Sequence, residues 1–413
     1  MEPFVAEYFG EPHRRVLLIG GAGFDPRSLT VAKLLLPVLG NRLDALFIRE
    51  RRPSPSPSLR ERAEAHLAEL QRLIPSTRVV DVKVFESDGA VVLGRRLVEE
   101  VRYVDMSRYT DVIVDFSALS VGSSFPVTRL LLTRIEAEDE TGDTISQRLN
   151  LHAMVTARPT TDDRIVPAPS SIVGPVHGFP GRFGLDETAR AAKLWLPQLR
   201  FGQRGILERL YDYLRPDDVV PVLPFPSDDP RIGDRLIEHY AAEFDSRWSV
   251  DARSIVYADE RSPLDFYRTV LRIDDGRHPV FAESGGSLLI LSPVGSKVLA
   301  LGGMMAAVER DLPVVYVEAL SYTADLQADE EASYLPADVV HVWLLGEAYP
   351  RASSDAANRN AEVSSRMIQH TGDHGAAGAA APPALASSGA ADAAAVGPVS
   401  EPEAQERNEA VGQ

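Results

Sequence analysis

Short apolar runs bounded by glycine or by polar residues alternate, in the first part of the chain, with stretches of helical periodicity. Apolar residues recur at helical spacing between residues 59 and 74, for example, whereas residues 80–84 alternate as a strand does. Further strands are predicted at residues 16–19, 43–48 and 112–114. Strands that alternate with helices are typical of a doubly wound parallel sheet, so residues 1–158 are predicted to form a Rossmann-like domain.

The same alternation returns in the second part of the chain. Strands are predicted at residues 219–223, 254–258, 288–291 and 314–317, with an edge strand at 339–345. Residues 204–350 are therefore predicted to form a second Rossmann-like domain. The expected fold class is α/β, with two tandem Rossmann-like doubly wound parallel sheets.

Two segments lack either periodicity. Residues 159–203 begin with a long run rich in Pro, Gly and Ser, which predicts a loop that either connects the domains or covers a site. Residues 351–413 consist mainly of Ala, Ser, Gly, Pro and Glu and contain no aromatic residue. Such a composition cannot bury enough apolar surface to offset the entropy of ordering, so a disordered C-terminal tail is expected.

Two short motifs occur once in each half. Asp25-Pro26-Arg27 has a counterpart in Asp229-Pro230-Arg231, and Val121-Gly122-Ser123 has one in Val294-Gly295-Ser296. Both pairs fall at predicted strand ends in the same order, which favours internal duplication of one Rossmann-like unit. The alternative is that α/β proteins share a common strand–turn–helix grammar, in which Asp-Pro begins helices.

The first glycine-rich turn predicts an anion site. Gly20, Gly21 and Gly23 follow the opening strand, where main-chain N–H groups at a helix start can approach a phosphate. Arg27 is suited to bidentate contact with a phosphate, and Asp25 either binds a ribose or caps the following helix. The turn fits neither the dinucleotide fingerprint nor a P-loop, and the glycines alternatively serve only the tight turn. No cofactor is identified.

Ligand contacts are also predicted in three other turns. In the second half, the turn of Ser292, Gly295, Ser296 and Lys297 combines hydroxyls with a lysine at a helix start. Its first-half counterpart holds Ser123 and Ser124, and lacks the lysine. The site is expected to consist of residues 20–27 with residues 120–124, or of Asp229 and Arg231 with residues 292–297.

The stretch Leu289–Lys297, which runs into an apolar helix and then a strand, resembles the ligand loop of CARF-type (CRISPR-associated Rossmann fold) sensor domains. The resemblance covers about thirty residues. It implies a Rossmann-like domain that binds a nucleotide, because those sensors bind cyclic oligoadenylates. Pro-Val-Gly-Ser stands here where that family has Gly-Gly-Thr, and no nuclease motif follows.

Charge and composition limit the kinds of partner and the cellular location that are expected for the protein. The net charge of −17 argues against duplex nucleic acid as the main partner, since phosphates require clustered Lys and Arg. The absence of cysteine, of a signal-peptide pattern and of an 18-residue apolar run favours a cytoplasmic protein without a membrane span. A homo-oligomer or a protein partner is compatible with such sheets.

Catalytic residues are weakly indicated. His177, in a Gly/Pro-rich segment, is the best acid/base candidate, although a structural role suits it better. Asp115, Glu283 and Glu318 lie near strand ends and are weaker candidates, and no metal-ligand spacing occurs in the ordered part.

The favoured function is binding of a nucleotide or other phosphorylated small molecule, as a sensor or regulatory component. The alternatives are an enzyme acting on a nucleotide-like substrate (a hydrolase or a phosphoryl or glycosyl transferase) and a non-catalytic scaffold.

Overall fold

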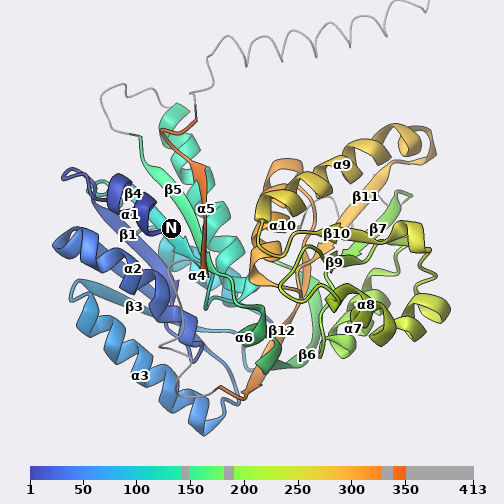
Figure 1. Ribbon diagram of the computed structural model, residues 1–413, viewed down its shortest axis with the longest axis horizontal. Coiled ribbons are helices and arrows are strands. Elements are labelled where there is room, and N and C mark those ends of the chain that lie inside the picture. The colour runs from blue at the N-terminus through green and yellow to red at the C-terminus, as the bar shows by residue number, and fades with distance from the viewer. Residues whose placement is uncertain (141–147, 181–189, 327–337, 350–413) are drawn as a thin grey trace, which may run out of the picture. The chain divides into compact units, whose positions relative to one another are not determined.

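The larger sheet of the protein has six strands in the order β13-β5-β4-β1-β2-β3 (Figure 1). Strands β1 to β5 come from the first half of the sequence, and β13 joins them from residues 339–345. The computed structural model describes residues 1–140, 148–180, 190–326 and 338–349. Strands β1 to β5 are parallel, as expected, and β13 pairs antiparallel with β5. The strands are β1 (Val16–Gly21), β2 (Leu43–Arg51), β3 (Thr77–Lys83), β4 (Asp111–Asp115), β5 (Asn150–Thr156) and β13 (Val339–Leu345).

Helices cover both faces of this sheet, because its central strand is apolar on both sides. Val16 and Leu18 of β1 pack in the same cluster as residues of α1, α2 and α3, whereas Leu17 and Ile19 pack with residues of α4 and α5. This half is therefore doubly wound. The helices are α1 (Glu2–Tyr8), η1 (Pro26–Leu29), α2 (Thr30–Leu39), η2 (Gly40–Arg42), α3 (Pro57–Leu73), α4 (Leu93–Val101) and α5 (Val121–Glu140).

The second half contains shorter parallel strands. A three-stranded sheet has the order β11-β7-β8, and β9 pairs with β10. Single bridges link Gln198 to Val222 and Leu291 to Val314, so these pieces adjoin one another. The strands are β7 (Ala192–Pro197), β8 (Asp218–Val219), β9 (Val222–Pro224), β10 (Val256–Ala258) and β11 (Ser287–Ser292). The helices are α7 (Arg204–Leu214), α8 (Ile232–His239), η4 (Glu243–Arg247), η5 (Ala252–Ser254), α9 (Pro263–Phe281), η6 (Ala282–Ser284) and α10 (Lys297–Arg310).

In the segment predicted as a long loop, residues 159–175 and 192–197 instead form secondary structure. Its first residues form α6 (Pro159–Arg164), followed by β6 (Ile165–Pro175), which pairs antiparallel with β12 (Val315–Ala324). Strand β6 tolerates its three prolines because this ribbon has only two strands, which leaves one side of β6 without a hydrogen-bonding neighbour. Strand β7, also in this segment, is the central strand of the second sheet.

These strands bear on the two repeated motifs. Val121-Gly122-Ser123 begins α5 after β4, and Val294-Gly295-Ser296 precedes α10 after β11, so the two copies occupy comparable turns. Asp25-Pro26-Arg27 follows β1, but Asp229-Pro230-Arg231 follows β9, which is not the first strand of its half because β7 precedes it. Duplication of one unit therefore stays a prediction. The edge strand expected in the second half, β13, belongs to the first sheet.

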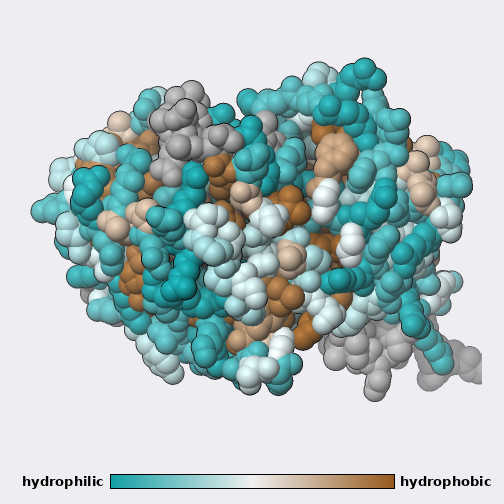
Figure 2. All heavy atoms as spheres, turned by 90° about the horizontal axis from the view of Figure 1, so that it is seen from below, coloured by the Kyte–Doolittle hydropathy of each residue, from teal (hydrophilic) through white to brown (hydrophobic). Residues whose placement is uncertain are grey.

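The surface seen in Figure 2 is largely hydrophilic, with smaller hydrophobic patches between the polar side chains. In the parts of the chain described above, no helix combines the length and the apolar character that crossing a bilayer requires. The tail predicted to be disordered, residues 351–413, lies outside the described residues.

Candidate functional site

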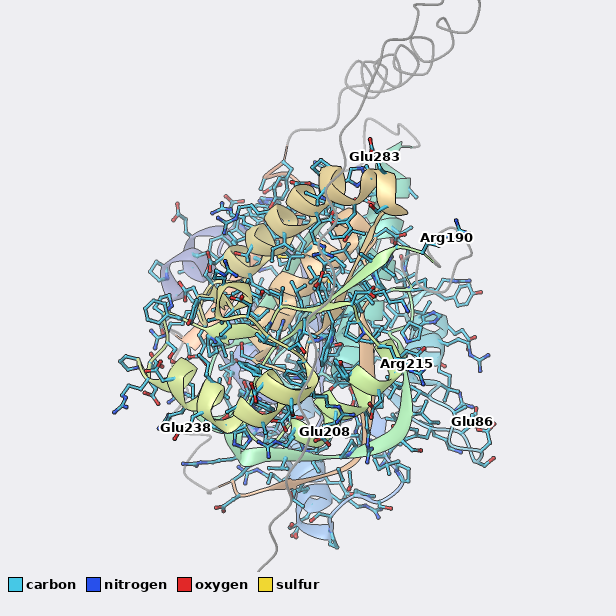
Figure 3. The ribbon with its side chains drawn as sticks, turned by 90° about the vertical axis from the view of Figure 1, so that its right-hand side faces the viewer. Glu86, Arg190, Glu208, Arg215, Glu238 and Glu283 are labelled. Carbon is cyan, nitrogen blue, oxygen red and sulfur yellow. The ribbon has the colours of Figure 1, made fainter. Side chains whose placement is uncertain are left out.

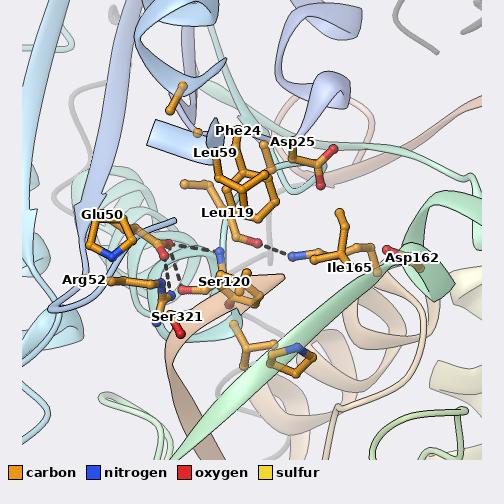
Figure 4. A pocket seen from close by; sticks show the side chains of 18 of the residues that line it. Phe24, Asp25, Glu50, Arg52, Leu59, Leu119, Ser120, Asp162, Ile165 and Ser321 are labelled. Carbon is orange, nitrogen blue, oxygen red and sulfur yellow. Dashed lines mark hydrogen bonds and ion pairs between the residues drawn. The ribbon is translucent and has the colours of Figure 1, made fainter. Parts of the chain in front are cut away.

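A cavity of about 490 Å³ lies where turns from the two halves meet (Figure 4). The first half supplies the turn after β1, the end of β2, the start of α3 and the turn before α5. The second half supplies the turn between β11 and α10 and the start of α7, and α6, β6 and β12 complete the wall. This is the position expected for a ligand in an open α/β sheet, beyond the carboxyl ends of the parallel strands.

The lining of the cavity is rich in cations although the whole chain carries a net charge of −17. Seven basic residues and four carboxylates line the cavity, and four of the arginines also pair with Asp81, Asp163 or Glu318 outside the lining. The basic residues are Arg27, Arg49, Arg51, Arg52, Arg60, Arg200 and Lys297, and the carboxylates are Asp25, Glu50, Glu64 and Asp162. A wall with this many cationic side chains favours an anionic ligand.

Arg27 is held rigidly in the cavity wall. Asp25 is the N-cap of η1, where it accepts a hydrogen bond from the Arg27 main-chain N–H at 3.0 Å and binds the guanidinium in a bidentate pair. The guanidinium also reaches Asp162 of α6 at 2.8 Å. Burial opposes the charge on Arg27, but the two carboxylates outweigh it and hold the pKa of Arg27 well above its usual value. Arg27 Nη1 has no hydrogen-bond partner among the described residues.

Lys297 is the first residue of α10, whose N-cap is Ser296. Its ammonium group donates to the main-chain carbonyl of Leu119, and among the described residues it forms no ion pair with a carboxylate. Burial and the neighbouring Arg27 lower the pKa of Lys297, with Asp162 opposing them. A cation that faces another cation at a helix N-terminus is a favourable place for an anion.

Glu50 ties β2 to the turn that precedes α5. Its Oε1 accepts hydrogen bonds from the Ser120 main-chain N–H at 3.0 Å and from the Ser120 hydroxyl at 2.7 Å (Figure 4). It also accepts a hydrogen bond from the hydroxyl of Ser123 at 2.7 Å. Burial raises the pKa of Glu50, but the charge of Arg52 and the hydrogen bonds from these hydroxyls lower it by a larger amount. The pKa of Glu50 therefore lies below its usual value. The hydroxyl of Ser123 is therefore bound inside the protein.

Arg52 extends this network to the second half. Its guanidinium binds Glu50 at 2.6 Å, Glu318 of β12 at 3.3 Å and the carbonyl of Ala319, and lies 5.0 Å from the ring centroid of Tyr322. Burial raises the pKa of Glu318, whose Oε1 has no hydrogen-bond partner in the described ranges. The interaction fixes β12 against the cavity wall.

Of the three glycines predicted to follow the opening strand, Gly20 and Gly21 are instead its last residues, and only Gly23 lies in the turn. A Cβ on Gly21 would lie 2.9 Å from the main-chain carbonyl of Ala118, so Gly21 permits a close approach of the end of β1 to the turn after β4. Gly20 lies within β1 and would make only ordinary contacts there. Gly23 has no neighbouring atom within 4 Å of its Cβ position, and it lines the cavity.

The other predicted residues near the cavity serve mainly structural contacts. Helix α5 begins at Val121 and therefore includes Ser123 and Ser124, which were expected in a turn. The hydroxyl of Ser124 donates to the Ser120 carbonyl at 2.9 Å. Ser292 ends β11 and accepts from Trp195 Nε1 at 3.0 Å. Gly295 lines the cavity, and a Cβ there would lie 2.8 Å from that of Gln198.

Several predicted residues lie away from the cavity. Asp229 caps the turn before α8 and pairs with Arg235, and neither Asp229 nor Arg231 is among the lining residues. His177 is exposed beside α4, and Glu283 projects from the surface (Figure 3). The structure therefore groups the predicted turns across the two halves: the turn of Asp25 and Arg27 meets the turn of Lys297.

Sequence reasoning missed several lining residues. Glu50 and Arg52 had a usable signal, because charged residues directly follow an apolar strand at the edge where ligands bind. Asp162, Gln203 and Tyr322 had none, since their segments carry no motif. Within the described part of the chain, no three His, Asp or Glu side chains are placed to hold a metal ion.

Comparisons with known proteins give no family. No family model and no curated protein matches the chain. The delta-N METTL16 MTase domain is similar over 38% of this chain and 62% of its own length, with 12% identity and a TM-score of 0.19. A structure reported as a UDP-N-acetylglucosamine 2-epimerase from Listeria monocytogenes is similar over 72% of this chain and 88% of its own, with 10% identity and a TM-score of 0.22. Scores this low support no conclusion about a ligand or a reaction.

Proposed function

We propose that the protein binds a phosphorylated small molecule, such as a nucleotide, in the cavity between its two halves. The observation that carries this proposal is Lys297, a partly accessible cation in the cavity wall with no carboxylate partner among the described residues and with Arg27 nearby. A phosphate would accept hydrogen bonds from this ammonium and balance its positive charge. Binding serves a sensory or regulatory role in this proposal.

The arrangement of the cations supports a bound anion. Arg27 and Lys297 stand far apart in the sequence, yet both line the same cavity. The free Nη1 of Arg27 offers a further donor once the ligand displaces neighbouring groups. A buried donor without a partner costs about 1–3 kcal/mol, a cost that a bound phosphate would remove.

A narrower form of the proposal follows the resemblance of residues 289–297 to the ligand loop of CARF-type sensors. In this form the ligand is a cyclic oligonucleotide, whose phosphates would lie against Lys297 at the start of α10. The cavity is lined by residues of both halves, so one ligand would contact both.

A thermal-shift screen of the full chain tests the proposal. The panel pairs two phosphorylated compounds with their uncharged counterparts, adenosine monophosphate with adenosine and glucose 6-phosphate with glucose. It also contains a cyclic oligoadenylate. A ligand at a hundred times its Kd adds about 2.7 kcal/mol of stability, which raises Tm by several degrees. We expect at least one phosphorylated compound to raise Tm and its uncharged counterpart to leave Tm unchanged. If no phosphorylated compound raises Tm, or if the uncharged counterparts raise it equally, the proposal is wrong.

A further inference from the structure

A second polar group in the cavity wall lacks a partner. Gln203 is the N-cap residue of α7 and lines the cavity, yet its side chain makes no capping hydrogen bond. The residue is 5% exposed, and its Oε1 is buried without a hydrogen-bond partner among the residues described. Buried polar groups in proteins are nearly always paired, so an unpaired amide oxygen at a cavity favours a ligand group that pairs with it.

The wall also offers flat apolar surfaces. Phe24 and Tyr322 form a ring pair with centroids 5.5 Å apart, and both line the cavity. Leu59 and Ile165 line it as well (Figure 4). Burial raises the pKa of Tyr322 to about 12, so its phenol stays neutral at physiological pH. Inorganic phosphate or a bare sugar phosphate would leave these surfaces without a matching group.

We propose that the ligand is a nucleoside phosphate, whose base lies against Phe24 and Tyr322 and hydrogen-bonds to the amide of Gln203. This inference rests on the proposed function, because Lys297 is assigned to the phosphate. A glutamine amide presents one donor and one acceptor side by side, which matches the adjacent donor and acceptor on the edge of a base. Aromatic rings stack on bases of any sequence, so Gln203 supplies the specificity.

The size of the cavity agrees with this class of ligand. Its volume of about 490 Å³ lies within the range of pockets that enclose a molecule the size of a nucleotide. The lining also combines the two features that such a ligand needs: cations at Arg27 and Lys297, and rings at Phe24 and Tyr322.

Isothermal titration calorimetry on the full chain tests the inference with three probes: adenosine monophosphate, uridine monophosphate and ribose 5-phosphate. We expect at least one nucleotide to bind about tenfold or more tightly than ribose 5-phosphate, the effect of one stacked base. Gln203→Leu should weaken that nucleotide about 5- to 20-fold and leave ribose 5-phosphate unchanged. The control is Gln71→Leu, on the exposed surface of α3, which should change neither affinity.

Phe24→Leu provides a second variant that does not depend on a buried amide. It keeps an apolar side chain but removes the ring, so it should weaken the nucleotide selectively. Equal affinities for the nucleotides and ribose 5-phosphate, or equal losses for both in Gln203→Leu and Phe24→Leu, would overturn the base site while phosphate binding stands. If none of the three probes binds the wild-type protein, the base site is overturned, and the proposed function falls with it if no phosphorylated compound of the thermal-shift panel raises Tm.

Discussion

Arg27 and Asp162 form a buried ion pair, with 2.8 Å between the guanidinium nitrogen and the carboxylate oxygen. The two residues come from η1, after the first strand, and from α6, after the last parallel strand of the first sheet. Each is less than a tenth exposed. The pair thus joins the first half of the protein to the segment that leads into the second, at the wall of the cavity.

This pair predicts a large loss of stability on removal of Arg27. Arg27→Met leaves the carboxylates of Asp25 and Asp162 buried without their cation, which should lower the free energy of unfolding by roughly 3–5 kcal/mol. Urea unfolding measures the change. Arg78→Ala, which breaks an exposed pair with Glu100, is the control and should change stability by less than about 1 kcal/mol. Equal effects of the two substitutions would show that Arg27 is not a structural ion-pair partner.

Asp115 predicts a dependence of stability on pH. Burial raises the pKa of Asp115 to about 7, above its usual value of about 3.9 in an unfolded chain. Between these two values the folded state binds the proton and the unfolded state does not, so the contribution of Asp115 to stability is lost as the pH rises to about 7.

Asp115→Asn should remove this dependence, because an amide keeps the acceptor for the Ser117 N–H and cannot ionise. Relative to the wild-type protein, the variant should gain stability between pH 5 and pH 8. Urea unfolding at the two pH values measures the gain. A stability difference that is the same at pH 5 and pH 8 would contradict the raised pKa.

Helices α9 and α10 offer a matched pair of glycines. A Cβ on Gly302 of α10 would lie 2.2 Å from the Pro263 carbonyl oxygen, whereas a Cβ on Gly276 of α9 would have no neighbour within 4 Å. Gly302→Ala should therefore destabilise the protein by about 1–3 kcal/mol. Gly276→Ala should stabilise it by about 0.5–1 kcal/mol, because alanine favours the helix. Thermal unfolding of both variants would refute this packing if their Tm values shift in the same direction.

The charge of Lys297 is expected to favour ligand binding but to lower the free energy of unfolding of the ligand-free protein. Burial and Arg27 disfavour its charge in the folded protein without ligand, so Lys297→Met should leave the free energy of unfolding unchanged or raise it. Chemical unfolding without ligand measures this. A loss of more than about 1 kcal/mol would instead mark Lys297 as a residue that holds the fold together.

The sequence predicted the fold class well where apolar runs were long. The runs at β1, β2 and β4 are apolar on both faces because helices cover both sides of the sheet, and this pattern is legible without a structure. Strand β6 was missed because its prolines and glycine resemble a loop, and only its pairing with β12 makes it a strand. Strand β7 lies in the same segment and was missed with it.

The candidate site was predictable only in part. Lys297, Arg27 and Gly295 were singled out because they stand in turns at helix starts, and all three line the cavity. Their grouping was not predictable, since local sequence does not reveal which turns of two sheets meet. Ser123 and Ser292 were predicted to contact a ligand because each carries a hydroxyl near a strand end. In the structure the hydroxyl of Ser123 is bound to Glu50, and that of Ser292 to Trp195.

The measurement that tests the central claim most directly compares the affinity of wild-type protein and Lys297→Met for adenosine monophosphate by calorimetry. Lys83→Met, which removes an equal charge from the exposed end of β3, is the control. We expect Lys297→Met to lose at least about tenfold in affinity, the worth of a charge-assisted hydrogen bond to a phosphate, while Lys83→Met binds as the wild type does. Equal affinities of the two variants, or no binding by the wild-type protein, would contradict a phosphate site at Lys297.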